Sequence, residues 1–334
     1  MITIFDDRQL AHAPERELNN GAWTAYQESP DRARQIAKAF DVMAQPEDFG
    51  LDPIAVVHDR AYLGFLRSAY DEWRDAGREG DAIGYAFPII RRRANSHIRI
   101  DAKIGAHSFD AATPITADTW ESAYWSAQTA LSGLQPVLKG EARSAFALCR
   151  PPGHHAGADY MGGYCYLNNA AIAAQAARAR ADRVAILDID YHHGNGTQDI
   201  FYDRSDVFFA SIHADPATDY PYYWGFAEET GAGAGEGVTL NLPLARGAEA
   251  VLYRKTLAKA LSAISDWGAE LLVVSFGADT FAGDPISSFA LETSDYAAIG
   301  RQVAELAQPT LIVMEGGYAV GQLGAIVGEF LSGF

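Results

Sequence analysis

The feature that most constrains the fold is an apolar run followed directly by acids and histidines. Residues 184–187 are Val-Ala-Ile-Leu, and residues 188–196 are Asp-Ile-Asp-Tyr-His-His-Gly-Asn-Gly. Four consecutive apolar residues predict a strand buried in a parallel sheet. On an extended backbone Asp190 and His192 point to the same side, so both could bind one zinc or similar divalent ion. The alternative is a helix-capping aspartate beside surface histidines.

Strand and helix patterns alternate from about residue 119 to residue 314, which predicts an α/β fold with a central parallel sheet and helices on both faces. We expect one domain, residues 1–334, with a long insert at about 76–118 where glycines and prolines interrupt any period. Within this insert, Arg91, Arg92 and Arg93 are expected to form a solvated patch. Strands are expected at 2–5, 145–149, 184–187, 207–212, 271–275 and 310–314, and helices at 31–44, 58–73, 120–138, 168–181, 250–265 and 294–306.

The composition narrows the class of protein. The chain has 334 residues, 49% of them hydrophobic, which is enough for a large core. Lys and Arg number 26 against 43 Asp and Glu, and the net charge of −17 argues against nucleic-acid binding and favours cationic ligands. The two cysteines, Cys149 and Cys165, lack disulfide-framework or zinc-finger spacing. Acids near the start and no apolar run of membrane-spanning length predict a cytoplasmic protein that is neither exported nor bound to a membrane.

Further candidate site residues follow three other predicted strands. His154 and His155 come after residues 145–149, Asp279 after 271–275, and Glu315 and Tyr318 after 310–314. Ligands of open parallel sheets bind just outside the carboxyl ends of the strands. These segments are therefore expected to meet in one pocket.

The residue types suggest a catalytic metal centre. Asp279 is the expected third ligand, although it could instead cap a helix, whereas Asp284 before Pro285 is better explained as a turn residue. Two carboxylates and one imidazole leave coordination positions open, as in catalytic rather than structural zinc sites. Such an ion needs a partner that moves protons, and His154 and His155 are the candidates.

Two acceptors and a phenol complete the expected site. Asp188 and Asn195 are placed in sequence to orient the two histidines. Tyr318 follows two glycines, and its hydroxyl could donate to an oxygen that becomes an oxyanion. A packed aromatic is the alternative reading of this tyrosine.

Several motifs together resemble the zinc-dependent histone deacetylase superfamily. They are RPPGHHA (150–156), GGYCYLNNAA (162–171), ILDIDYHHGNGTQDIFY (186–202), ASIHADP (210–216), GADTFAGDP (277–285) and MEGGY (314–318). The resemblance implies an arginase-like α/β fold. YAFPIIRRR (85–93), ITADTW (115–120) and GFAEETGAGAG (225–235) are most similar to bacterial acetylpolyamine amidohydrolases.

The resemblance implies roles for the site residues. Asp190, His192 and Asp279 would bind zinc, with iron as an alternative ion. His155 would act as general base and acid, His154 would act mainly through its charge, and Tyr318 would polarise the acetyl carbonyl. A potassium ion would be held by Asp188, by the Ser211 hydroxyl, and by the carbonyls of Asp188, Asp190, His192 and Ile212.

The resemblance also implies how substrate binds. Gly163, Tyr164 and Tyr220 would flank the acyl chain, and Glu17 and Asp101 would meet ammonium groups. Two positions depart from the family pattern: Asn195 stands where many protein deacetylases have Asp, and Ala112 takes the place of an acid. In the amidohydrolases the long insert helps form a homodimer and narrows the entrance.

The expected activity is hydrolysis of N-acetyl amides of cationic aliphatic amines, such as acetylpolyamines, with release of acetate. Deacetylation of acetyl-lysine in proteins is the first alternative. A two-metal ureohydrolase and a non-catalytic amine-binding module are the others.

Overall fold

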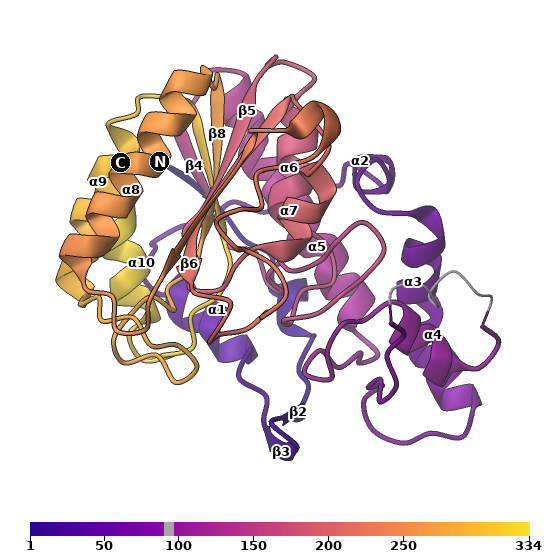
Figure 1. Cartoon of the computed structure of the whole chain (residues 1–334). Helices are drawn as coiled ribbons and strands as arrows, with labels where there is room; N and C mark the ends of the chain where they lie inside the picture. The colour runs from indigo at the N-terminus through magenta and orange to yellow at the C-terminus, as the bar shows by residue number, and fades with distance from the viewer. Residues whose placement is uncertain (90–96) are drawn as a thin grey trace.

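Seven parallel strands form the centre of the protein in the computed structural model, which describes residues 1–89 and 97–334. The strand order is β1-β4-β9-β8-β5-β6-β7, and every neighbouring pair is parallel, which confirms the predicted α/β class (Figure 1). Arg91, Arg92 and Arg93 lie outside the described residues. The strands are β1 (Ile2–Ile4), β4 (Ser144–Ala147), β5 (Val184–Asp188), β6 (Val207–Ala214), β7 (Thr239–Leu244), β8 (Leu271–Phe276) and β9 (Thr310–Met314).

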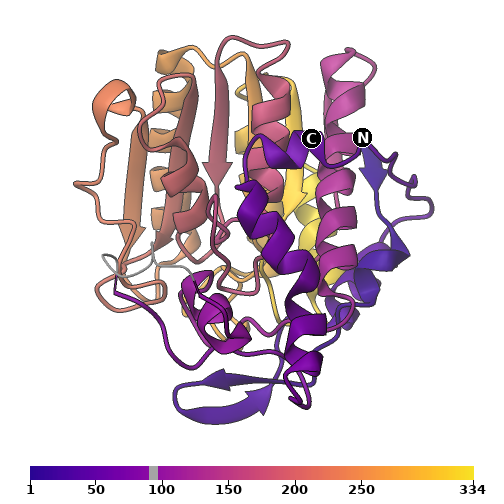
Figure 2. The same ribbon diagram turned by 90° about the vertical axis from the view of Figure 1, so that its right-hand side faces the viewer.

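Helices cover both faces of this sheet. Successive strand side chains point to opposite faces, so Ala145 and Ala147 belong to one core cluster while Phe146 belongs to the other. Helices α5 and α6 pack in the first cluster, and α1, α8, α9 and α10 pack in the second (Figures 1 and 2). The helices are α1 (Pro30–Ala37), α2 (Asp52–Ala55), α3 (Arg60–Asp75), α4 (Ile100–Ala106), α5 (Thr119–Leu138), α6 (Asn169–Ala177), α7 (Asn195–Phe201), α8 (Ala250–Trp267), α9 (Tyr296–Ala304) and α10 (Leu323–Leu331).

Burial of strand β5 on both faces explains its sequence. All five of its residues are buried, because β6 and β8 flank it and helices cover it above and below. Its last residue, Asp188, pairs in register with Ser211 of β6 and Ser275 of β8. The chain therefore leaves the middle of the sheet at the point where the acids and histidines begin.

The sequence patterns did not predict some of the observed elements. Strand β7 contains Pro243, which lacks an N–H, but β7 is the last strand of the sheet and has a partner on one side only. The hairpin β2 (Arg16–Asn19) and β3 (Ala22–Ala25) turns at Asn20 and Gly21, both with positive φ, as expected for an Asn-Gly hairpin turn. Helix α10 was also missed, and the helix expected at 31–44 ends at Ala37.

The insert at 76–118 packs against the rest of the chain. Ala82 and Ile115 exchange backbone hydrogen bonds, and Ile100 and Ile104 of α4 belong to the same core cluster as α5 and α6. This part of the insert therefore shares a hydrophobic core with α5 and α6, while the single domain stays a prediction. In the described ranges, none of the helices combines the length and the apolar character needed to cross a membrane.

Candidate active site

The three expected metal ligands meet beyond the carboxyl ends of β5 and β8. Ligand atoms of Asp190, His192 and Asp279 all lie within 4.8 Å of one another, and all three residues are buried. His192 Nδ1 is 3.1 Å from Asp279 Oδ2 and 3.3 Å from Asp190 Oδ1. The Tyr191 N–H donates a hydrogen bond to Asp279 Oδ1, which links two segments that are 88 residues apart in the sequence.

The surroundings of these ligands fit a divalent cation. A Cβ on Gly316 would lie 2.4 Å from Asp279 Oδ2 and 2.6 Å from Asp190 Oδ2, so only glycine fits beside the two carboxylates. Burial first, and then the charge of Asp190, raise the pKa of Asp279. Burial alone would lower the pKa of His192, but Asp190 and Asp279 raise it to about 10. This position therefore attracts positive charge, and its donor set suits zinc or a similar ion.

The paired histidines have different partners. His154 Nδ1 lies 3.0 Å from Asp188 Oδ2, whereas His155 Nδ1 lies 2.7 Å from Asn195 Oδ1. Burial alone would lower the pKa of His154, but Asp190 and Asp188 raise it to about 10. Burial, reinforced by the neighbouring His154 and His192, lowers the pKa of His155 well below its ordinary value. These surroundings favour the charged form of His154 and the neutral form of His155, which can accept a proton.

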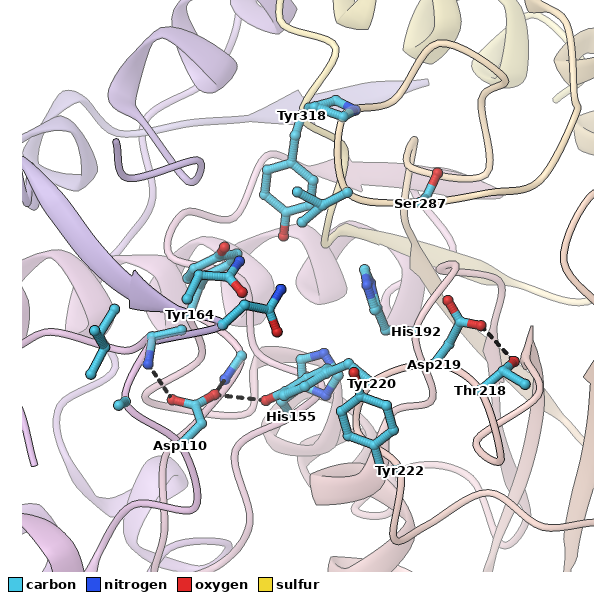
Figure 3. A pocket seen from close by; sticks show the side chains of 18 of the residues that line it. Asp110, His155, Tyr164, His192, Thr218, Asp219, Tyr220, Tyr222, Ser287 and Tyr318 are labelled. Carbon is cyan, nitrogen blue, oxygen red and sulfur yellow. Dashed lines mark hydrogen bonds between the residues drawn. The ribbon is translucent and has the colours of Figure 1, made fainter. Parts of the chain in front are cut away.

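Tyr318 lies across the pocket from His155 and His192, with its phenol directed into the pocket (Figure 3). Burial raises the pKa of Tyr318 well above its ordinary value, so its hydroxyl keeps its proton. Asp284 accepts hydrogen bonds from the N–H groups of Tyr318 and Ala319 and holds the loop. Asp284 is therefore a structural turn residue, in keeping with its sequence context.

A buried arginine fixes the same loop from behind. Arg32 of α1 donates to the carbonyls of Glu315 and Gly317, and its guanidinium carbon lies 4.8 Å from the centre of the Tyr318 ring. Glu28 neutralises this charge at 2.6 Å and also pairs with the buried Arg150 at 3.0 Å. The tyrosine is thus placed by a buried ionic network.

The expected potassium ligands lie on the neighbouring strands β5 and β6. Asp188 pairs in register with Ser211, and Ile212 follows Ser211. The Ser211 hydroxyl lies 2.8 Å from His213 Nδ1, and Asp188 Oδ1 accepts a hydrogen bond from the Asp190 N–H. The structure thus brings Asp188 and Ser211 together on neighbouring strands.

A cavity of about 490 Å³ opens from the site to solvent. Gly163, Tyr164 and Tyr220, which the resemblance implies flank an acyl chain, line it together with His155 and Tyr318. The four side chains of this set are labelled in Figure 3. Gly163 approaches His155 so closely that a Cβ would lie 2.2 Å from the His155 ring. Tyrosine rings thus line this cavity.

The two predicted acids lie in different places. Glu17 is buried behind the pocket wall, where its carboxylate accepts a hydrogen bond from the Tyr164 hydroxyl at 2.9 Å. Burial raises the pKa of Glu17 to about 7. Asp101 is not among the described residues that line this cavity. It lies on α4, where it forms ion pairs with Arg78 and Arg99. Ala112 does line the cavity, as an apolar side chain.

Asp110 is the lining acid that the sequence analysis missed. Its carboxylate accepts hydrogen bonds at 2.7 Å from both the Gly163 N–H and the Tyr220 hydroxyl, so it joins the two walls of the channel (Figure 3). Its further donors, the Ala112 N–H and the Thr113 hydroxyl, are also neutral. None of these four partners cancels its negative charge. A second lining acid, Asp219, is paired with Arg246 at 3.0 Å.

Comparison with known proteins decides the family. The sequence profile of the histone deacetylase domain matches residues 23–334. The chain belongs to the histone deacetylase family. This confirms the resemblance found in the sequence, and the parallel sheet with helices on both faces is the deacetylase fold.

Within the histone deacetylase family, several relatives that match over their full length have names of one kind. Acetylpolyamine amidohydrolase 2 of Pseudomonas aeruginosa is 48% identical over 340 residues, covering 100% of this chain and 98% of the relative. The acetylpolyamine amidohydrolase of Mycoplana ramosa is 45% identical and covers 100% of this chain and 99% of the relative. A crystal structure of acetylpolyamine aminohydrolase from Burkholderia pseudomallei superposes with a TM-score of 0.96 at 42% identity, covering 100% of this chain and 98% of that one.

Proposed function

We propose that this protein is a zinc-dependent amidohydrolase that removes acetyl groups from acetylated polyamines or similar cationic aliphatic amines. The observation that supports this most is that His192 shares one ligand group with Asp190 and Asp279 and lines the same cavity as His155 and Tyr318. The names of the full-length relatives point to the same substrates. A two-metal ureohydrolase is disfavoured by the family, and a non-catalytic module by the presence of both histidines and the tyrosine.

Asp190, His192 and Asp279 would hold the zinc ion. When bound, such an ion lowers the pKa of a water molecule and polarises a carbonyl oxygen. Asp188 and Ser211, with the carbonyls of Ile212, Asp190 and His192, are the proposed potassium ligands. A second cation beside the buried carboxylates would help offset their charge.

The chain's own residues then divide the work of amide hydrolysis. Neutral His155 takes a proton from the attacking water and later returns it to the leaving amine nitrogen. The Tyr318 hydroxyl donates a hydrogen bond to the carbonyl oxygen as negative charge develops there. Cationic His154, held by Asp188, adds positive charge beside His155. Acetate and the free amine are the products.

Acidic groups around the cavity favour a positively charged substrate. The Asp110 carboxylate lies at the channel wall, and Glu17 lies behind Tyr164. The net charge of −17 would raise the local concentration of amines. We propose Asp110 as the acid that meets an ammonium group, while the predicted Glu17 acts only through its charge from behind Tyr164.

Asp110→Asn should lower kcat/KM for N-acetylputrescine about 10-fold, because one charge-assisted contact is lost. The same variant should change kcat/KM for the uncharged N-butylacetamide much less. The neutral substrate controls for any shift of Gly163 or Tyr220, since such a shift would affect both substrates. An equal loss for both would remove the ammonium-binding role from Asp110.

The substrate class can be tested with a panel of acetylated compounds on zinc-loaded protein. N-acetylputrescine and acetylspermidine should be hydrolysed with a higher kcat/KM than acetyl-lysine peptides. The physical reason is that the aromatic channel between Tyr164 and Tyr220 admits one slender chain, whereas the peptide backbone of a protein substrate must stay outside. A preference for the peptides would instead support the protein deacetylase alternative.

The predicted homodimer also belongs to the proposal. Tyr85, Ile89 and Ile98 of the insert are 74%, 76% and 92% exposed, which is unusual for large apolar side chains. A second copy covering this part of the insert would bury them. A cytoplasmic location is likewise proposed, in keeping with the free and buried Cys149 and Cys165.

A further inference from the structure

A line of three side chains runs outward from His155 toward solvent. Asn195 Oδ1 lies 2.7 Å from His155 Nδ1, and Asn195 Nδ2 lies 3.5 Å from the Tyr160 hydroxyl oxygen. The Tyr160 hydroxyl in turn donates to Asp199 Oδ2 at 2.5 Å. His155 and Asn195 are buried, Tyr160 is half-buried and Asp199 is exposed. The metal ligands and Tyr318 are not part of this line.

The local structure holds Tyr160 in place. Asn195 and Asp199 are one turn apart on α7 and so share a face of the helix, and the Tyr160 hydroxyl contacts both. The Tyr160 ring lies edge-on to Phe109, with ring centres 5.7 Å apart. It also lies so close to Gly157 that a Cβ there would be 2.3 Å from the ring. The phenol therefore has a built position between two loops and a helix.

The orientation of the Asn195 amide decides which nitrogen of His155 can accept a proton. An amide has an acceptor at one end and a donor at the other, and either end fits the same space. With Oδ1 toward His155, Nδ1 carries the ring proton and Nε2 is free to accept one. With the amide reversed, Nδ1 would accept from Nδ2, and the ring proton would move to Nε2. His155 could then no longer act as a base toward the pocket.

We propose that Tyr160 and Asp199 are positioning residues that hold the Asn195 amide in the productive orientation. Asp199 accepts a hydrogen bond from the Tyr160 hydroxyl, so the phenol oxygen presents its lone pairs to Asn195. Those lone pairs attract the Nδ2 end and repel the Oδ1 end. The role of His155 is that of the proposed function, on which this inference rests.

The protonation of Tyr160 and the presence of an amide at position 195 both agree with this arrangement. Burial and the charge of Asp199 raise the pKa of Tyr160 well above its ordinary value, so the phenol remains a donor. A neutral amide does not relay protons readily, so the line orients His155 and does not conduct protons to solvent. An aspartate at position 195 would need no such device, because both of its oxygens are acceptors.

The first test measures kcat and KM of zinc-loaded Tyr160→Phe and Asp199→Asn with N-acetylputrescine. Each should lower kcat about 3- to 10-fold, which is the effect expected from the loss of one hydrogen bond, and should leave KM unchanged. Tyr124→Phe is the matched control, because the Tyr124 hydroxyl donates to Asp48 away from the pocket. Its kcat should equal that of the parent. Unchanged kcat in Tyr160→Phe would overturn the proposal.

A double-mutant cycle separates orientation from packing. In an Asn195→Asp background, the carboxylate cannot be reversed, so adding Tyr160→Phe should cost little. If Tyr160→Phe lowers kcat equally in both backgrounds, its effect is one of packing and the proposal is wrong.

A readout without turnover keeps this inference separate from the proposed function. In protein labelled with ¹⁵N-histidine, protonated and unprotonated ring nitrogens have well-separated chemical shifts. His155 should show an unprotonated Nε2 in the parent and in Tyr124→Phe, and a mixture of tautomers in Tyr160→Phe. An unchanged tautomer in Tyr160→Phe would contradict the proposal, whether or not acetylated amines prove to be substrates.

Discussion

Tyr318→Phe is expected to lower kcat for N-acetylputrescine about 10²- to 10³-fold, as loss of one oxyanion donor does in other enzymes. The substitution removes only the hydroxyl group of a buried phenol that is directed into the pocket (Figure 3). The ring would keep its contacts with Tyr164 and Arg32, so the loop should not move. KM should change much less than kcat, because the contact strengthens only as charge develops on the oxygen. Steady-state kinetics and metal analysis on the same preparation measure both effects.

Tyr222→Phe provides the control for this prediction. Tyr222 also lines the cavity but is 49% exposed, and no step of the proposed reaction uses its hydroxyl. Its kcat should match that of the parent. If Tyr318→Phe retained the parent turnover, the oxyanion role of Tyr318 would be refuted.

Asp279→Asn should abolish zinc binding and turnover together. Replacing one of two carboxylate ligands removes a negative charge and a strong oxygen donor from a buried three-residue set. Zinc should raise the melting temperature of the parent, because it binds only the folded state, and should leave that of the variant unchanged. Metal content per chain, acetate release and thermal melts with and without zinc would measure the three effects.

Asp219→Asn tests whether any acid in the pocket would give the same result. Asp219 is similarly buried and lines the same cavity, but it is paired with Arg246 and is not one of the three ligands. The variant should bind one zinc per chain. Full zinc occupancy in Asp279→Asn would show that the ion lies elsewhere.

The grouping of Asp190, His192 and Asp279 was predictable because it depends on strand geometry and on the order of strands in a parallel sheet. Asp190 and His192 stand two residues apart after an obvious buried strand, and Asp279 follows another strand of the same sheet. Parallel strands bring their carboxyl ends to one edge, so the sequence order of strands and acids was enough. The same reasoning placed His154, His155 and Tyr318, whose loops follow β4 and β9.

The substrate end of the pocket was less predictable because the insert forms part of it. Asp110 and Asp101 are both acids of the insert, and no periodic pattern distinguishes them. Their fates depend on tertiary contacts, since Asp110 binds Gly163 and Tyr220 whereas Asp101 is neutralised by two arginines. The amphipathic rules for helices and strands carry no information on such contacts. The proposed role of Tyr160 could not be predicted for the same reason, because it also depends on tertiary contacts.

The central claim is that one zinc ion at Asp190, His192 and Asp279 supports hydrolysis of an acetylated amine. Its most direct test is to measure acetate release from N-acetylputrescine by protein with a known zinc content, before chelation, after chelation and after zinc is restored. We predict that acetate release is lost with the metal and returns in proportion to zinc, up to one ion per chain. Folded, fully zinc-loaded protein that releases no acetate, or release that chelation leaves unchanged, would contradict it.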